Sequence, residues 1–106
     1  MAFSKFHLYP EFLQQVSYFA QALSYPGRLE ILLKLKTEGP LRVAEIAKGL
    51  PISLETLSEH LKILREAQLI IAVERFPYTF YENNEMNLAR AQEAFNGFFL
   101  LLKNER

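Results

Sequence analysis

The side chains best placed to do chemistry in this chain lie between Ser53 and Leu69. Residues three or four positions apart share one face of a helix, at about 100° per residue. One such face of this stretch is polar and carries Glu55, Ser58, Glu59, Lys62 and Glu66. Carboxylates and hydroxyls can hydrogen-bond base edges in a DNA groove, and an ammonium can contact phosphate. The simpler alternative is an amphipathic helix whose polar face is only solvated.

Other kinds of chemistry have few residues to use. The chain has no Cys, which excludes disulfides, thiolate metal sites and thiol redox sensing. Its histidines are His7 and His60, and all twelve acidic residues are Glu. Two isolated histidines without Cys or Asp form no recognisable transition-metal site and no nucleophile–base pair. The sequence therefore indicates neither an enzyme nor a bound metal or cofactor.

The same stretch carries its own helix signals. Ser53 is a typical N-cap, whose hydroxyl accepts from the first backbone N–H groups of a helix. Ile52 and Leu57 stand at the two positions of a hydrophobic staple. Leu57, Leu61 and Leu64 repeat at i, i+4 and i+7, so they form an apolar back. We expect a capped helix with this back against the core and the polar face outward.

Length and composition bound the fold class. At 106 residues the chain suits one domain with one core, and its 50% hydrophobic residues argue against disorder. Lys and Arg balance Glu at twelve each, so any attraction to nucleic acid must come from a local patch. The first residues lack a secretory signal, and no apolar run approaches the ~18 residues of a transmembrane helix. We expect a soluble, cytoplasmic protein with no membrane partner.

Apolar spacing and breaker residues divide the chain, taken as a single domain over 1–106, into helices and one hairpin. The predicted elements are a loose lead-in over 1–8, helices over about 10–23, 26–36, 43–50 and 53–69, a hairpin over about 70–82 and a last helix over about 87–104. Residues 41–42 form a short extended piece, and Pro77 marks the bend of the hairpin. The third and fourth helices, about residues 43–68, form a helix-turn-helix with the hairpin as its wing. The predicted fold is a mainly α winged helix-turn-helix, in the order α-α-(short β)-α-α-β-β-α.

The last helix is more apolar than a small core requires. Its face and that of the first helix combine the residues that we assign to a dimer interface: Phe12, Val16, Phe19, Leu88, Ala91, Phe95, Phe98, Phe99 and Leu102. An exposed apolar face of that size marks an interface. A two-fold dimer would present two helices about 34–36 Å apart to successive major grooves of a palindromic site.

Three groups of residues carry a resemblance to a known family. They are Ala22-Leu23, Pro26, Arg28-Leu29 and Ile31-Leu32; Ala44-Glu45-Ile46-Ala47; and Thr56-Leu57-Ser58, His60-Leu61, Leu64-Arg65-Glu66-Ala67 and Leu69. With the hairpin ending in Phe80-Tyr81, the stretch over about 20–82 resembles the ArsR family of bacterial winged-helix repressors. The resemblance implies a homodimer that binds operator DNA near a promoter, with the first and last helices forming the interface.

The chain departs from that family's pattern at several places. Metal-sensing members carry Cys-Val-Cys where this chain has Arg42-Val43-Ala44, and others use Asp and His on the last helix, where this chain has neither. Both familiar metal sites are therefore missing. Glu55 and Glu59 stand where family members usually have uncharged or basic residues. The wing has Phe76-Pro77-Tyr78 where a Gly and basic residues are common.

The predicted DNA contacts fall into two groups. The N-terminal half of a recognition helix reaches the bases, which favours Leu54, Glu55, Ser58 and Glu59 after the cap Ser53. Phosphate contacts, or support at the helix edge, are expected from Arg42, Lys48, Thr56, His60, Lys62, Arg65 and Arg75. Two of these have a second interpretation: His60 as a residue hydrogen-bonded at the edge of the core, and Arg75 as a solvated charge.

The function predicted from the sequence is a DNA-binding transcriptional regulator. We expect a repressor that binds a palindromic operator as a homodimer and senses neither metal nor thiol redox state. A carboxylate can accept from a cytosine amine but repels phosphate, so DNA binding should be weaker or more salt-sensitive than in basic relatives. The alternative is a winged-helix protein–protein interaction module whose DNA binding is weakened. The sequence names no small-molecule effector.

Overall fold

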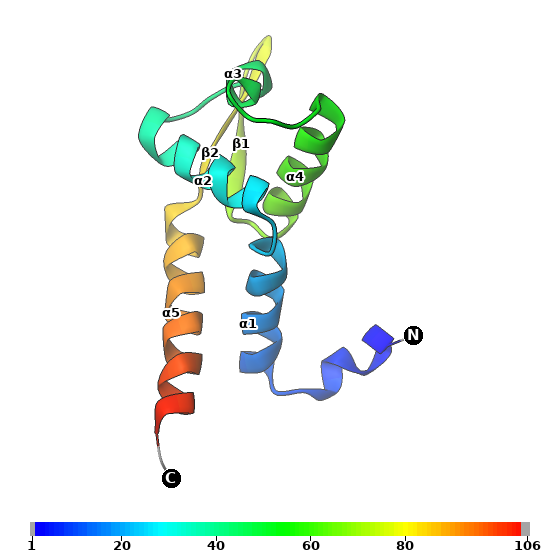
Figure 1. The fold of residues 1–106 in the computed structure, drawn as a ribbon, viewed down its shortest axis with the longest axis vertical. Helices are drawn as coiled ribbons and strands as arrows, with labels where there is room; N and C mark the ends of the chain where they lie inside the picture. The colour runs from blue at the N-terminus through cyan, green and yellow to red at the C-terminus, as the bar shows by residue number, and fades with distance from the viewer. Residues whose placement is uncertain (1, 105–106) are drawn as a thin grey trace.

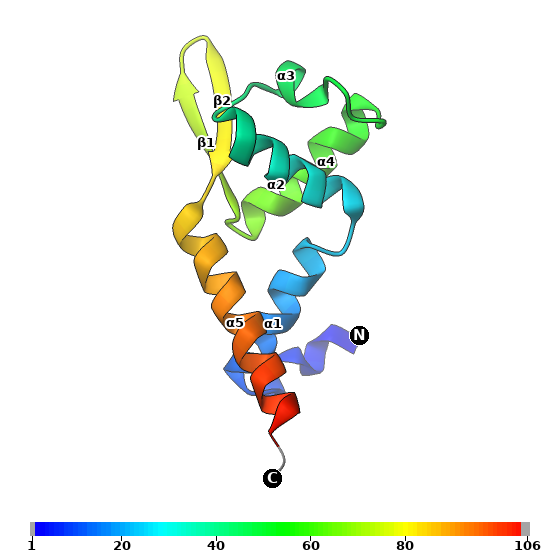
Figure 2. The same cartoon turned by 60° about the vertical axis from the view of Figure 1, so that its left-hand side comes forward.

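Two helices run side by side and carry a head formed by the elements that lie between them in the chain (Figures 1 and 2). The computed structural model describes residues 2–104, within overall dimensions of 53 × 32 × 26 Å. In chain order the elements are the 3-10 helix η1 (Ala2–Leu8), α1 (Glu11–Ala22), α2 (Pro26–Glu38), α3 (Val43–Ala47), α4 (Leu54–Glu66), β1 (Ile70–Arg75), β2 (Tyr78–Asn83) and α5 (Glu85–Lys103). The two helices that run side by side are α1 and α5, and their far ends point away from the head (Figures 1 and 2). The predicted winged helix-turn-helix fold is confirmed.

The wing is a regular antiparallel hairpin. Its register runs from Ile70 opposite Asn83 to Arg75 opposite Tyr78, which leaves a two-residue turn at the tip. Leu41 forms an isolated antiparallel β-bridge with the second strand of the hairpin. Its N–H donates to the Tyr81 carbonyl at 3.0 Å, and its carbonyl accepts from the Tyr81 N–H at 2.8 Å. The extended piece predicted before α3 therefore ties the helix-turn-helix to the base of the wing.

Several element ends differ from the predicted ones for local reasons. The lead-in that we expected to be loose contains η1. α3 ends at Ala47, before the predicted residue 50, because Lys48 turns extended and Gly49 takes a φ of 81°. α4 ends at Glu66, and Gln68 follows it with a φ of 59°. α5 begins two residues early, where the Asn84 side chain accepts from the Asn87 N–H at 3.3 Å.

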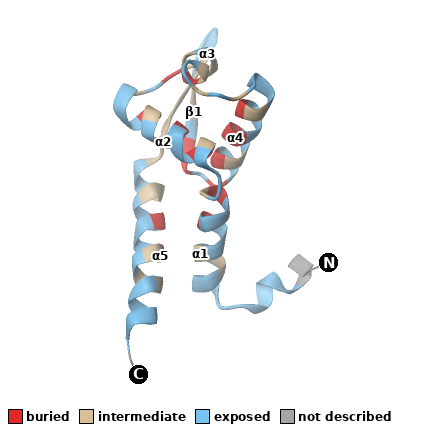
Figure 3. Cartoon of the chain, in the orientation of Figure 1, coloured by how far each residue is buried: buried red, intermediate tan, exposed pale blue. Residues whose placement is uncertain are grey.

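The core lies in the head, between α2, α3, α4 and the start of β1. Its fully buried large side chains are Ile31, Ile46, Leu57, Leu64, Leu69 and Ile70. Figure 3 shows that buried residues gather there, while the far halves of α1 and α5 are almost wholly exposed. Within residues 2–104, no helix combines the length and apolarity that crossing a membrane would require.

The residues assigned to a dimer interface divide between core and surface. Phe19 and Ala91 are only 4% and 3% exposed, because α1 and α5 pack on each other within one chain. This burial removes both residues from the predicted interface. Val16, Leu88 and Phe95 also pack partly against the core, and Phe98 is half-buried. The exposed members are Phe12, Phe99 and Leu102.

Candidate nucleic-acid interface

The polar face of α4 lies open on the head. The apolar back predicted for this helix is buried, with Leu57 and Leu64 at 0% exposure and Leu61 at 3%. The opposite side chains are exposed: Leu54, Glu55, Ser58, Glu59, Lys62, Arg65 and Glu66. The predicted cap is confirmed, because the Thr56 N–H donates to Ser53 Oγ at 3.1 Å. The Ser53 hydroxyl also donates to Thr56 Oγ1 at 3.1 Å, so these two side chains fix the start of the helix.

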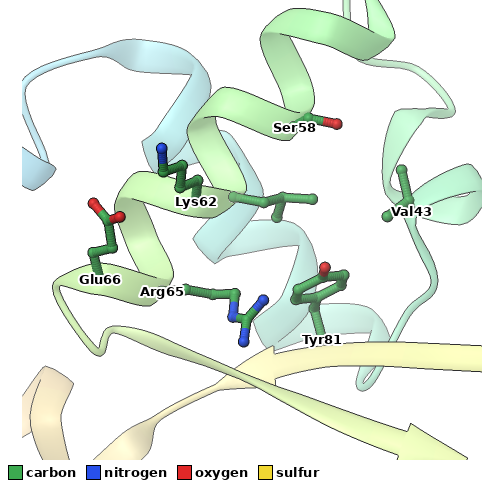
Figure 4. Close-up of a pocket in the computed structure, with 7 residues that line it drawn as sticks. Val43, Ser58, Lys62, Arg65, Glu66 and Tyr81 are labelled. Atoms are coloured by element: carbon green, nitrogen blue, oxygen red, sulfur yellow. The ribbon is translucent and has the colours of Figure 1, made fainter.

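A groove of about 410 Å³ separates α4 from the wing (Figure 4). From α4 it is lined by Ser58, Leu61, Lys62, Arg65 and Glu66, and from the other side by Val43 and Tyr81. Figure 4 shows the Arg65 side chain extending from α4 toward Tyr81 of β2. An ammonium, a guanidinium and two hydroxyls therefore line one channel, with a single carboxylate at its end. That set of donors suits a phosphate backbone lying along the groove.

Arg42 braces the wing against α3. The backbone N–H of Arg42 donates to Glu45 Oε1 at 2.8 Å, and the Arg42 guanidinium lies 3.6 Å from Glu45 Oε2. The hydrogen bond from the Arg42 N–H holds the pKa of Glu45 below its usual value. The guanidinium also stacks over the Tyr78 ring, 4.6 Å from its centre. The Arg42 guanidinium thus already contacts Glu45 and Tyr78 within the chain, so it is less available for the phosphate contact predicted from the sequence.

The remaining cations proposed for phosphate lie outside the groove. Lys48 is exposed just after α3, and its carbonyl accepts from the Lys34 ammonium. Arg75 is exposed at the end of β1, beside the tip of the wing. The structure therefore brings Ser58, Lys62 and Arg65 together in the groove, whereas Lys48 and Arg75 are isolated positive charges outside it.

His60 does not face solvent. It is 6% exposed, and its Nδ1 lies 3.0 Å from Nη1 of the buried Arg28. A guanidinium can only donate, so Nδ1 accepts and the imidazole proton resides on Nε2. Burial, aided by the Arg28 charge and opposed by Glu59, lowers the pKa of His60. A phosphate contact by His60 is ruled out by this burial, and the hydrogen-bonded position at the edge of the core describes it correctly.

Arg28 is the residue at this site that the sequence analysis did not single out. Its Nε donates to the Ala22 carbonyl at 2.7 Å, and its Nη2 reaches the Gln21 carbonyl at 3.3 Å and Ser24 Oγ at 3.4 Å. One side chain of α2 thus satisfies the end of α1 and holds His60 of α4. The available signal was an arginine among leucines, inside a group of residues that carries the family resemblance.

The other end of α4 is held by α1 and by the start of α5. The Tyr18 hydroxyl of α1 donates to the Glu66 carbonyl at 2.8 Å. From the α5 side, Asn87 Nδ2 donates to the Ala67 and Gln68 carbonyls at 3.1 Å each, and Asn84 Nδ2 to Gln68 at 2.9 Å. These bonds satisfy carbonyls that a helix end leaves without partners. They also fix the polar face of α4 relative to α1 and α5.

A metal site has no visible basis in the part of the chain that the structure describes. No group of three or more His, Cys, Asp or Glu side chains there is placed to hold an ion. The expectation that the chain does not sense metal stays a prediction.

Comparison with known proteins agrees with this geometry. Residues 25–72 match the model of the bacterial regulatory protein, arsR family. This part of the chain is therefore similar to the helix-turn-helix region of that family. The match contains α2, α3, α4 and the start of β1, which are the elements around the core and the groove.

Individual relatives extend the similarity over more of the chain. Two are HTH-type transcriptional regulators of Mycobacterium tuberculosis: Rv2034, 44% identical over 50 residues, and NmtR, 32% identical over 77 residues. These alignments cover 47% and 70% of this chain but only 46% and 63% of the relatives, so the chain spans less than two thirds of either. A solved structure, the homodimeric winged helix-turn-helix DNA-binding domain of Mb0332 from Mycobacterium bovis, superposes with a TM-score of 0.66 at 28% identity. It covers 88% of this chain and 84% of that one.

Proposed function

We propose that this chain is a DNA-binding transcriptional regulator, and that it represses by binding a palindromic operator as a homodimer. The observation that carries the proposal is the exposed polar face of α4 beside a groove lined by Lys62 and Arg65. The matched relatives are transcriptional regulators by name, and the Mb0332 domain is a homodimeric DNA-binding domain. Both descriptions support the same role here.

The bases are read from the first half of α4 in this proposal. Leu54, Glu55, Ser58 and Glu59 are exposed there, and a recognition helix contacts base edges with its N-terminal residues. Ser53 and Thr56 act indirectly, since their hydroxyls are occupied with capping the helix. The two glutamates would accept from cytosine amines, which gives sequence preference but no electrostatic attraction.

In this proposal, affinity for the DNA phosphate backbone depends on a small number of basic side chains. Lys62 and Arg65 hold the phosphates along the groove, Lys48 and Arg75 add outlying contacts, and Arg42 contributes what its stacking on Tyr78 leaves free. Because the chain has no net charge, binding depends on this local set and should weaken steeply with added salt. Release of the operator would then use neither metal nor thiol chemistry.

The dimer of this proposal forms through the far halves of α1 and α5. The exposed apolar side chains there are Phe12, Leu13, Phe99, Leu100, Leu101 and Leu102. Pairing this surface across a two-fold axis would remove them from water and place two α4 helices on successive major grooves, about 34–36 Å apart. The half-buried Phe98, with Val16, Leu88 and Phe95 behind it, would back the contact.

Selection of bound fragments from genomic DNA by the purified protein tests the proposal. We expect enrichment of an inverted repeat whose half-site centres lie one helical turn apart. The double variant Lys62→Ala/Arg65→Ala should lose this enrichment, while Lys36→Ala, which removes an exposed cation of α2, should keep it. Failure of the unmodified protein to enrich any duplex would overturn the proposal.

A second function has one observation in its favour. Glu55 and Glu59 make the exposed front of α4 acidic, which suits a basic protein partner better than a phosphate backbone. The chain would then be a winged-helix interaction module with weakened DNA binding. Removing the charge at these positions separates the two, because Glu55→Gln/Glu59→Gln should tighten general DNA binding but abolish binding to a basic partner.

A further inference from the structure

Phe76 is the most exposed large apolar side chain that the structure describes. Its exposed fraction is 98%, against 70% for Leu8 and 69% for Met86. Neither face of the ring packs on the hairpin, although Tyr78 and Phe80 next to it contact each other edge to face at 6.4 Å. A ring that is fully in water adds nothing to the stability of the fold and is free to contact a partner outside the chain.

Phe76 lies at the opposite end of the molecule from the proposed dimer surface. The wing tip lies at the same end of the molecule as the start of α4, whereas the free end of α5 lies at the opposite end (Figures 1 and 2). A second copy seated on α1 and α5 would therefore leave the wing tip uncovered. A duplex lying on α4 and its groove would pass close to it.

The tip end of the wing is braced, so the ring is presented on a firm support. Arg75 pairs with Tyr78 in the register, which makes Phe76 and Pro77 the whole of the turn. Arg42 stacks on Tyr78 at 4.6 Å, and the Thr79 hydroxyl donates to Glu74 at 2.9 Å across the hairpin. Binding through Phe76 would thus cost little ordering of the backbone.

The residues beside Phe76 favour nucleic acid as the partner of its ring. Arg75 is exposed beside Phe76 and has no ion-pair partner among the side chains that the structure describes. A cation next to an apolar ring matches the pattern of proteins that place an arginine in the minor groove and push an apolar wedge between base steps. The groove with Lys62 and Arg65 lies on the inner side of the same hairpin.

We propose that Phe76 is a wedge that enters the minor groove beside each half-site and partly unstacks one base step there. This inference rests on the proposed DNA binding through α4. Pyrimidine–purine steps such as TA and CA/TG unstack most easily, so the wedge would create a preference for them at a position that α4 does not touch. Phe76 thereby determines specificity outside the half-site that α4 reads.

A single tryptophan tests the wedge directly, because the chain contains none. Phe76→Trp keeps an aromatic ring at the tip, and Leu33→Trp places the same probe on an exposed position of α2. On addition of the selected duplex, the fluorescence at position 76 should be quenched and shielded from acrylamide, and that at position 33 should not change. Equal responses of the two probes would overturn the inference, as would a response of position 76 to anionic vesicles but not to the duplex.

Binding measurements on Phe76→Ala complete the test. We expect this variant to bind the selected duplex at least about thirtyfold more weakly, because a dimer loses one aromatic–base contact at each half-site. It should also lose the preference for TA or CA/TG at the flanking step, while Leu33→Ala should retain both. If the unmodified protein binds DNA and Phe76→Ala binds it with the same affinity and flanking preference, the wedge is refuted and the proposed function stands. If the unmodified protein binds no duplex at low salt, the proposed function itself fails.

Discussion

Replacing Arg28 by Met should remove a large part of the stability of the domain. Arg28 is 8% exposed, and its guanidinium donates to the Ala22 carbonyl at 2.7 Å and to His60 Nδ1 at 3.0 Å, both within the buried region. Met fills a similar volume but donates nothing, so both acceptors stay buried without a partner. Each such orphan costs about 1–3 kcal/mol. With the weaker bonds to Gln21 and Ser24 also lost, we expect a decrease of about 3–5 kcal/mol in the free energy of unfolding.

Urea denaturation at a fixed protein concentration measures this loss, since the stability of a dimer depends on concentration. Arg65→Met is the matched control, because Arg65 is exposed and its removal should change the free energy of unfolding by less than about 0.5 kcal/mol. A loss below about 1 kcal/mol for Arg28→Met, or equal losses for the two variants, would show that the bonds of Arg28 do not hold α1, α2 and α4 together.

Three further predictions concern His60, Ser53 and Gln68. The pKa of His60 is lowered in the folded protein, so the unfolded chain takes up the proton first as the pH falls. The free energy of unfolding is therefore unaffected above the ordinary pKa of about 6.5 and decreases below it, by at most about 1.4 kcal/mol per pH unit. Urea midpoints at pH 7.5 and 5.5 should differ more for the unmodified protein than for His60→Gln, and equal differences would contradict this. Ser53→Ala removes the cap of α4 and should cost about 1 kcal/mol in urea denaturation, whereas Ser17→Ala on the exposed side of α1 should not. Gln68→Gly relieves a left-handed backbone at a φ of 59° and should raise the free energy of unfolding by about 1 kcal/mol, and a decrease would show that the side chain outweighs the backbone.

The fold could be predicted because its determinants are local. The spacing of Leu57, Leu61 and Leu64, the cap at Ser53 and the bend at Pro77 each act within a few residues, and the structure confirms the elements that they predict. Element ends were less accurate, since they depend on backbone turns such as that at Gln68, where no Gly or Asn signals a positive φ.

The site was predictable only in part, because burial is decided by contacts between distant residues. His60 lies outside the polar face of α4, but its buried partner Arg28 is 32 positions earlier, so no local pattern reveals the pair. Phe19 and Ala91 lie on apolar faces that the sequence cannot divide between core and interface, and the packing of α1 on α5 makes that division. The groove itself needs α3, α4 and the wing together, so no spacing within one helix could reveal it.

The proposed placement of a phosphate backbone along Lys62 and Arg65 is tested most directly by the salt dependence of DNA binding. The dissociation constant for the selected duplex should be measured between about 50 and 200 mM salt for the unmodified protein, Lys62→Ala/Arg65→Ala and the control Lys36→Ala. Each phosphate contact contributes about 0.9 to the slope of log affinity against log salt concentration, so a dimer that loses these contacts should show a slope smaller by about 2–4. We expect that decrease for the double variant and an unchanged slope for Lys36→Ala. A double variant with the affinity and the slope of the unmodified protein would contradict the proposed role of the groove.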